Sequence, residues 1–193
     1  VAPEYLRTNI LALCDEEIAK AKEGKEAYLG FKANAITDKE LILKLIEASK
    51  AGVKVELLIR GISCLKPQIK GISENIRVVS VVGRYLEHGR IYRFGKGKEE
   101  RIYISSADLM TRNTMKRVEV AAPVLNGEYK KYLDHYFDTL FNDNVNGREL
   151  LEDGLYHYRT GEKKINAHSL FQKEAIEASK EGKIENQKGT EQK

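Results

Sequence analysis

The stretch that decides the fold is EAYLGFKANAITDKELILKLIEASKAGVKVELLI, residues 26–59. Its first seven residues, 26–32, have the composition of a strand. The capping-box pattern Thr37-x-x-Glu40 then predicts the start of a helix whose apolar residues share one face and which ends near Gly52. Residues 53–59 form a largely apolar run, which is typical of a strand buried on both faces. A strand, a helix and a strand joined by short connections predict a right-handed βαβ unit with parallel strands.

The flanking sequence extends this unit. Apolar residues at helical spacing predict a helix over 4–23, and Glu128 to Phe141 predicts another. Short β-like runs lie at 76–82, 89–94, 101–105 and 117–124, with Gly95–Lys98 as a hairpin loop between two of them. We therefore expect an α/β fold with a mixed, largely parallel sheet flanked by helices. Residues 1–170 form one domain, and the highly charged residues 171–193 are predicted to be a disordered tail.

Charge is unevenly distributed along the chain of 193 residues. Residues 60–117 hold 13 Lys or Arg and five Asp or Glu, a net charge of +8, whereas the whole chain carries +4. A localised positive field favours a polyanion or a ligand that bears phosphate. Solvated strand edges rich in Lys and Arg are the alternative interpretation.

Composition and motifs exclude several classes. No apolar run approaches 18 residues, so we expect no membrane-spanning helix. Two cysteines are too few for a disulfide framework or a structural zinc site. Walker, Gly-x-Gly-x-x-Gly, His-Glu-x-x-His and Cys-x-x-Cys patterns are missing. A first residue other than Met predicts a fragment of a longer protein, and the lack of a secretory leader favours the cytosol.

Two segments could together line a phosphate pocket. In the first, His88 and Arg90 stand two apart at the start of a strand, so their side chains share a face. An imidazole can transfer a proton while a neighbouring guanidinium holds phosphate oxygens. The second, residues 105–113, runs from a strand through small polar residues into a helix start, where free N–H groups suit an anion. A hydrogen-bonded surface histidine is the competing interpretation of His88, and His168 has no comparable context.

A third group of candidate residues lies at the ends of the two predicted parallel strands. Arg60 ends the second strand and is followed by Gly61, which would let a ligand approach closely. Lys32 ends the first strand and Asn34 follows it. In parallel sheets this edge is where ligands bind. A charged residue at a strand end can also be a simple solvent-facing stop.

Together these segments make the sequence recognisable. It resembles the carboxy-terminal catalytic domain of bacterial polyphosphate kinase of the phosphohistidine type, in order from about residue 1 to residue 170. The motifs that carry the resemblance are Leu58-Ile59-Arg60-Gly61-Ile62, Ser73-Glu74-Asn75-Ile76-Arg77, Val78–Val82, Arg84-x-Leu86-Glu87-His88-x-Arg90-Ile91-Tyr92 and Ile104-Ser105-Ser106-Ala107-Asp108-x-Met110-x-Arg112-Asn113.

The resemblance implies a phospholipase D-like half and the reversible transfer of the terminal phosphate of ATP to polyphosphate. The histidine that becomes phosphorylated would lie in a preceding domain. By the family pattern Arg60 and His88 contact ATP phosphates, with His88 assisting transfer. Arg90 and Arg112 are further candidates for phosphate binding. Weaker candidates are Lys32, Asn34, Ser106, Asn113 and Lys116.

The resemblance also implies cofactors and partners. These are Mg²⁺, with its ligands outside this chain, ATP or ADP, polyphosphate, the preceding domains and a homo-oligomer of the full-length enzyme. A cytoplasmic enzyme is expected, with a membrane-peripheral position as the alternative, and the fragment alone is expected to be inactive. Nucleic acid is not expected, although a non-catalytic polyanion or nucleic-acid binding module stays open. A phospholipase D-like hydrolase is disfavoured because Gly95 occupies the position of that superfamily's Asp.

Overall fold

A computed structural model describes the backbone of residues 1–190 and the side chains of residues 1–180. The elements alternate between helix and strand in the first part of the chain and become mainly strands after β2. The helices are α1 (Leu6–Lys22), α2 (Lys39–Lys50), α3 (Thr111–Met115), α4 (Gly127–Phe141) and α5 (Ala167–Thr190). The strands are β1 (Tyr28–Ala33), β2 (Lys54–Ile59), β3 (Ile76–Val81), β4 (Arg90–Phe94), β5 (Arg101–Ser105), β6 (Ala121–Pro123), β7 (Gly147–Leu150) and β8 (Tyr156–Tyr158).

The strands form one eight-stranded sheet in the order β6-β5-β4-β1-β2-β3-β7-β8. Strands β1, β2 and β3 are parallel, which confirms the predicted βαβ unit and the mixed sheet. Every other neighbouring pair is antiparallel, so parallel pairing is confined to the centre and the sheet is not largely parallel. The reason is that β4 turns back beside β1 and a tight loop joins it to β5, and such hairpins can only pair antiparallel.

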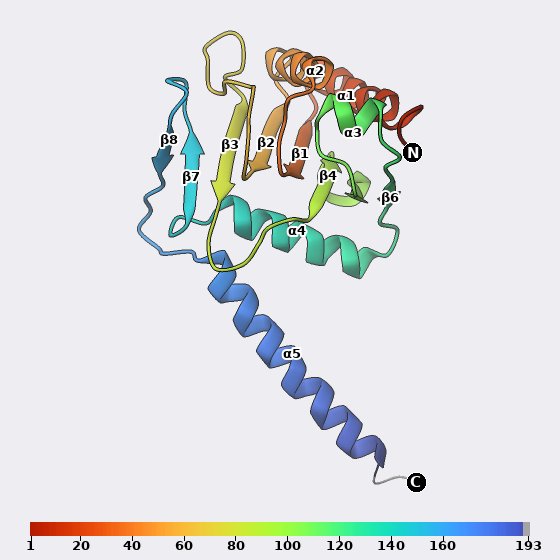
Figure 1. Cartoon of the computed structure of the whole chain (residues 1–193), viewed down its shortest axis with the longest axis vertical. Coiled ribbons are helices and arrows are strands. Elements are labelled where there is room, and N and C mark those ends of the chain that lie inside the picture. Colours follow the sequence, from red (N-terminus) through yellow and green to blue (C-terminus); the bar gives the residue numbers. More distant parts are fainter. Residues whose placement is uncertain (191–193) are drawn as a thin grey trace.

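The sheet is a middle layer between helices. Helices α1 and α2 lie against one face, α4 lies against the other, and α5 projects away from the body (Figure 1). Alternating residues of β2 explain the two layers, because Leu57 packs with the α1 and α2 side while Leu58 packs with Phe137 of α4. The central strands are therefore packed on both faces.

Helix α2 begins one residue later than the capping box predicts. Asp38 is its N-cap, and one carboxylate oxygen accepts hydrogen bonds from the N–H groups of Glu40 and Leu41 at 3.0 and 3.2 Å. The other oxygen accepts from the Thr114 hydroxyl at 3.0 Å. A buried Asp with a tertiary partner therefore replaces Thr37 as the cap.

The termini of other elements also differ from the sequence prediction. The strand predicted over 117–124 is reduced to β6, because it is an edge strand that pairs with β5 alone. Residues 171–190 continue α5, and residues 191–193 lie outside the described residues. The predicted disorder of the tail at 171–193 stays a prediction. Among the described residues, no helix is both long and apolar enough to cross a membrane.

Candidate functional site

The candidate residues gather at one edge of the sheet. Strands β1 and β2 are parallel and end at Ala33 and Ile59, so Asn34 and Arg60 follow them at the same edge. Strand β4 runs the opposite way and therefore begins there with Arg90, and β5 ends there. The structure thus brings together segments more than 70 residues apart in the sequence at the carboxyl ends of the parallel strands, as the Asn34–Asp108 contact shows.

Arg60 and His88 are in direct contact. One terminal guanidinium nitrogen of Arg60 lies 3.0 Å from Nδ1 of His88, and Nε of Arg60 donates to Oδ1 of Asn34 at 2.6 Å. A guanidinium can only donate, so Nδ1 accepts and the His88 ring carries its proton on Nε2. His88 is exposed. Its Nε2–H is therefore free to donate a hydrogen bond to an oxygen arriving from solvent.

Arg90 is held from two sides. Its guanidinium donates two hydrogen bonds to the Asp108 carboxylate, at 3.1 and 3.0 Å, and one to the main-chain oxygen of His88 at 3.3 Å. Asp108 also accepts from the backbone and side-chain amides of Asn34 at 2.7 and 3.1 Å. Burial raises the pKa of Asp108, but these hydrogen bonds outweigh it and hold the pKa below its ordinary value. The ionised Asp108 carboxylate therefore holds the side chains of Arg90 and Asn34 in place.

Lys32 is buried behind this edge. Its ammonium group donates to the main-chain oxygen of Gly89 at 2.9 Å and lies 3.2 Å from Glu87. Burial lowers the pKa of Lys32, Glu87 opposes that shift, and the charges of Arg60 and Arg90 add to it. Lys32 therefore supports the segment that carries His88 and adds positive charge beneath it.

Ser106 and Asn113 belong to a neighbouring cluster. Both donate to the carboxylate of Glu119, Asn113 at 2.8 Å and Ser106 through its hydroxyl, and the N–H of Val120 donates back to Ser106. Asn113 is buried whereas Ser106 is exposed. These bonds tie α3 and the segment after β5 to Glu119 and Val120, which lie just before β6. A role in phosphate binding stays a prediction for both residues.

Arg112 and Lys116 are exposed on and just after the short helix α3. Neither forms an ion pair with a carboxylate among the residues that the structure describes. Their charges are thus available to a ligand that bears phosphate, and the phosphate-binding role expected of them stays a prediction.

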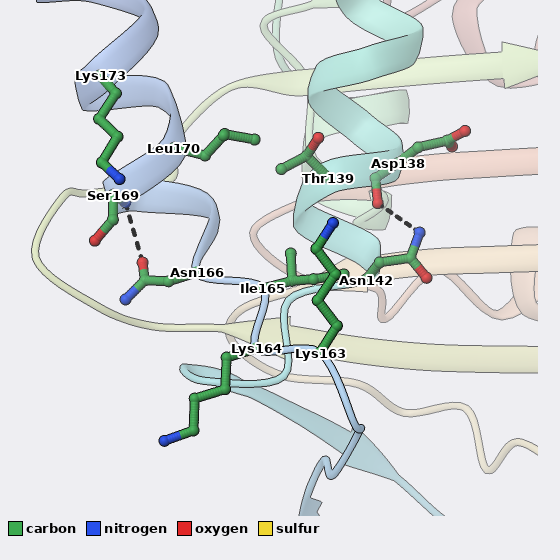
Figure 2. Close-up of a pocket in the computed structure, with 10 residues that line it drawn as sticks. All are labelled: Asp138, Thr139, Asn142, Lys163, Lys164, Ile165, Asn166, Ser169, Leu170 and Lys173. Atoms are coloured by element: carbon green, nitrogen blue, oxygen red, sulfur yellow. Dashed lines mark hydrogen bonds between the residues drawn. The ribbon is translucent and has the colours of Figure 1, made fainter.

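Two pockets are lined by residues of this edge of the sheet. One of about 320 Å³ is lined by Arg60, Gly61 and Arg148, among others, and one of about 420 Å³ is lined by Arg90, Ser105 and Tyr132, among others. A third, of about 510 Å³, lies between the end of α4 and the start of α5. Figure 2 shows this third pocket, whose lining includes Lys163 and Lys173 but none of the predicted site residues.

Sequence reasoning missed the residues that hold the site from behind. Glu87 lies inside the quoted motif but was not assigned a role, and its carboxylate binds His168, which we placed outside the site. The sequence around His168 gave no sign of this contact, because its partner is 81 residues away and no local pattern marks it. Asp108 was likewise quoted without a role, although the strand that precedes it and the basic partners in the chain are both visible in the sequence.

Comparison with known proteins gives a consistent set of matches. The family model described as polyphosphate kinase C-terminal domain 2 matches residues 1–169. The polyphosphate kinase of Bacillus cereus is 53% identical over 158 residues, which cover 82% of this chain and 22% of that protein. That of Staphylococcus saprophyticus is 48% identical over 187 residues, covering 96% and 26%.

Comparison with solved structures gives a match over most of the chain. The crystal structure of polyphosphate kinase from Porphyromonas gingivalis superposes with a TM-score of 0.83 and 36% identity, over 94% of this chain and 27% of that one. A phospholipase D family member, Nuc from Salmonella typhimurium, gives a TM-score of 0.49 at 17% identity, which is too low to bear on the fold. The chain spans about a quarter of the length of the relatives it matches.

Proposed function

Because the chain belongs to the polyphosphate kinase C-terminal domain 2 family, we propose that it is the part of a polyphosphate kinase that holds phosphates during transfer. The whole reaction would move the terminal phosphate of ATP to polyphosphate, reversibly. The terminal phosphorus–oxygen bond of ATP breaks, ADP leaves, and the phosphoryl group passes to a histidine in a preceding domain and then to an oxygen of the polyphosphate chain. This chain covers about a quarter of the length of its relatives, and the proposal places that histidine outside it.

The observation that carries the proposal is the contact between Arg60 and His88 at the carboxyl edge of the sheet. Phosphoryl transfer depends mainly on positioning and on neutralising charge. Arg60 supplies a fixed positive charge to the phosphate oxygens. Nε2–H of the exposed His88 supplies a hydrogen bond to the attacking or leaving oxygen.

Arg90 contributes to the same site mainly through the fixed position of its charge. Two of its hydrogen bonds are taken by Asp108 and a third by the main chain of His88. It adds positive charge, while Asn34 orients Arg60. Arg112 and Lys116 extend the positive surface along which polyphosphate would lie.

Mg²⁺ is implied by the family, but the described part of the chain does not fit it. No three His, Cys, Asp or Glu side chains gather as metal ligands among the described residues. The two carboxylates at this edge are occupied, Asp108 by Arg90 and Asn34 and Glu87 by Lys32. Magnesium prefers oxygen ligands that are free to coordinate it. No step proposed for this chain therefore runs through the ion.

The test is a calorimetric titration of the chain with ATP and with short-chain polyphosphate, with and without Mg²⁺. Replacing both residues, Arg60→Ala with His88→Ala, should weaken ATP binding by about a hundredfold. Arg101→Ala is the matched control, because Arg101 begins β5 at the opposite edge and pairs with Glu16. ATP binding that the double variant does not change would refute a phosphate site at this pair. Polyphosphate binding that ignores the double variant would then favour a non-catalytic polyanion module.

A further inference from the structure

The loop that carries His88 is exposed except at one residue. It joins β3 to β4, and Val82, Leu86 and His88 within it are exposed. Glu87 is the exception, with a side chain that is 11% exposed. Main-chain bonds inside the loop are few among the described residues, with the N–H of His88 donating to the oxygen of Leu86 at 3.1 Å. The position of His88 must therefore depend on how Glu87 is held.

Three elements converge on the Glu87 carboxylate. One oxygen lies 3.0 Å from Nε2 of His168 at the start of α5. The other accepts from the hydroxyl of Tyr136 on α4 and lies 3.2 Å from the ammonium of Lys32 on β1. The carboxylate thus has a hydrogen-bonding or charged partner on each oxygen, so moving it out of this environment would leave several buried groups without partners.

His168 has a defined orientation in this cluster. Its ring is buried, and its Nδ1 accepts a hydrogen bond from the N–H of Tyr85 at 3.3 Å. Because Nδ1 accepts, the proton is on Nε2 and points to Glu87. The ring also fits against Gly83, where a Cβ atom would come within 2.8 Å of Nδ1. His168 thus holds both the beginning of the loop and the residue next to His88.

We propose that Glu87, held by His168 and Tyr136, is a positioning residue that keeps the imidazole of His88 against Arg60. The phosphate-binding part of this idea rests on the proposed function, whereas the positioning part stands on the contacts alone. The base of α5 is therefore part of the site's framework, although it contributes no group to the phosphates.

Long-range ¹H–¹⁵N NMR correlations of the histidine rings test the positioning directly. In the wild-type chain at neutral pH, His88 should show a single Nε2–H tautomer. In Glu87→Ala and His168→Ala, His88 should show averaged tautomers, because its loop no longer holds the ring against Arg60. Glu87→Gln should fall between the wild type and Glu87→Ala, since its single amide oxygen can accept at one of the two carboxylate positions but not at both.

His135→Ala is the matched control. His135 also lies on α4 and bonds a glutamate of α5, Glu174 at 2.9 Å, but it does not touch the loop. It should leave the His88 signature unchanged. If His168→Ala does not fold, Tyr136→Phe keeps the side-chain volume and removes one of the three bonds, and it should shift the His88 signature in the same direction.

The two levels of the proposal fail separately. A His88 signature that is unchanged in Glu87→Ala and Tyr136→Phe would overturn the positioning role, whatever happens to ATP binding. A changed signature in a chain whose wild-type form binds no ATP would support the positioning role and count against the proposed function. Where ATP binds, Glu87→Ala should weaken it by about fivefold to tenfold, the equivalent of one ordinary hydrogen bond.

Discussion

The Arg60 guanidinium lies 3.0 Å from Nδ1 of His88, across 28 residues of sequence. The contact joins the end of a central strand to an exposed loop, and it fixes which ring nitrogen of His88 carries the proton. The two residues therefore act as one unit: the arginine provides charge and sets the tautomer, and the histidine presents a donor to solvent.

This coupling predicts non-additive losses of ATP affinity. Arg60→Ala and His88→Ala should each cost about thirtyfold, because each removes a bond to a charged group. The double variant should lose about a hundredfold, well short of the product, because Arg60→Ala already releases His88. A double-mutant cycle by calorimetry measures this, and losses that multiply fully would contradict the coupling.

Asp108→Asn should destabilise the fold in a way that depends on pH. The pKa of Asp108 is held below its ordinary value, so its stabilising contribution is present above the unfolded-state pKa of about 3.9 and is lost as pH falls through the folded value. The variant should lose about 2 kcal/mol of unfolding free energy at neutral pH. That difference should shrink at about pH 3.

Urea unfolding of both proteins at the two pH values provides the measurement. Glu16→Gln is a suitable control, because Glu16 pairs with Arg101 at an exposed position and its loss should cost little. A penalty for Asp108→Asn that is the same at both pH values would contradict the charge-based account.

Asp38→Ala should lower the unfolding free energy by about 1–2 kcal/mol, because it removes the N-cap of α2. It also removes the acceptor for the Thr114 hydroxyl of α3. Thr37→Ala is the matched control at the residue that the capping-box pattern favours, and it should change stability by about 0.5 kcal/mol or less. Equal losses in the two variants would show that the cap is not Asp38.

The centre of the fold follows closely from the sequence, for a physical reason. The largely apolar run at 53–59 has to be buried on both faces, which is why β2 appears at Lys54–Ile59. Strand β7, Gly147–Leu150, and strand β8, Tyr156–Tyr158, were not predicted, because they are short and lack an apolar alternation. Short strands near the edge of a sheet are specified by their pairing partners rather than by their own composition.

The candidate site, like the fold, was predictable only in part. Arg60, His88 and Arg90 could be found because each stands at the end or the start of a predicted strand, where sheets bind ligands. The contacts that hold them could not be found. Glu87 meets His168 and Asp108 meets Asn34 only after the chain folds, and both pairs are more than 70 residues apart in sequence.

Arg112→Ala combined with Lys116→Ala should weaken polyphosphate binding while leaving ATP affinity nearly unchanged. Both side chains are exposed, so they act on a long polyanion through a screened field. The loss should be largest at low salt and should fade as ionic strength rises. Titrations with short-chain polyphosphate at several salt concentrations measure it. An equal loss for ATP would instead place these residues in the nucleotide site.

The most direct test of the central claim, that Arg60 and His88 hold the phosphates of ATP, is the ³¹P NMR spectrum of ATP in the presence of the chain. The terminal phosphate resonance should shift and broaden on addition of the wild-type chain. This change should disappear with Arg60→Ala plus His88→Ala and persist with Arg101→Ala. A terminal phosphate resonance that responds equally to the double variant, or does not respond to the wild-type chain, would show that Arg60 and His88 do not hold these phosphates.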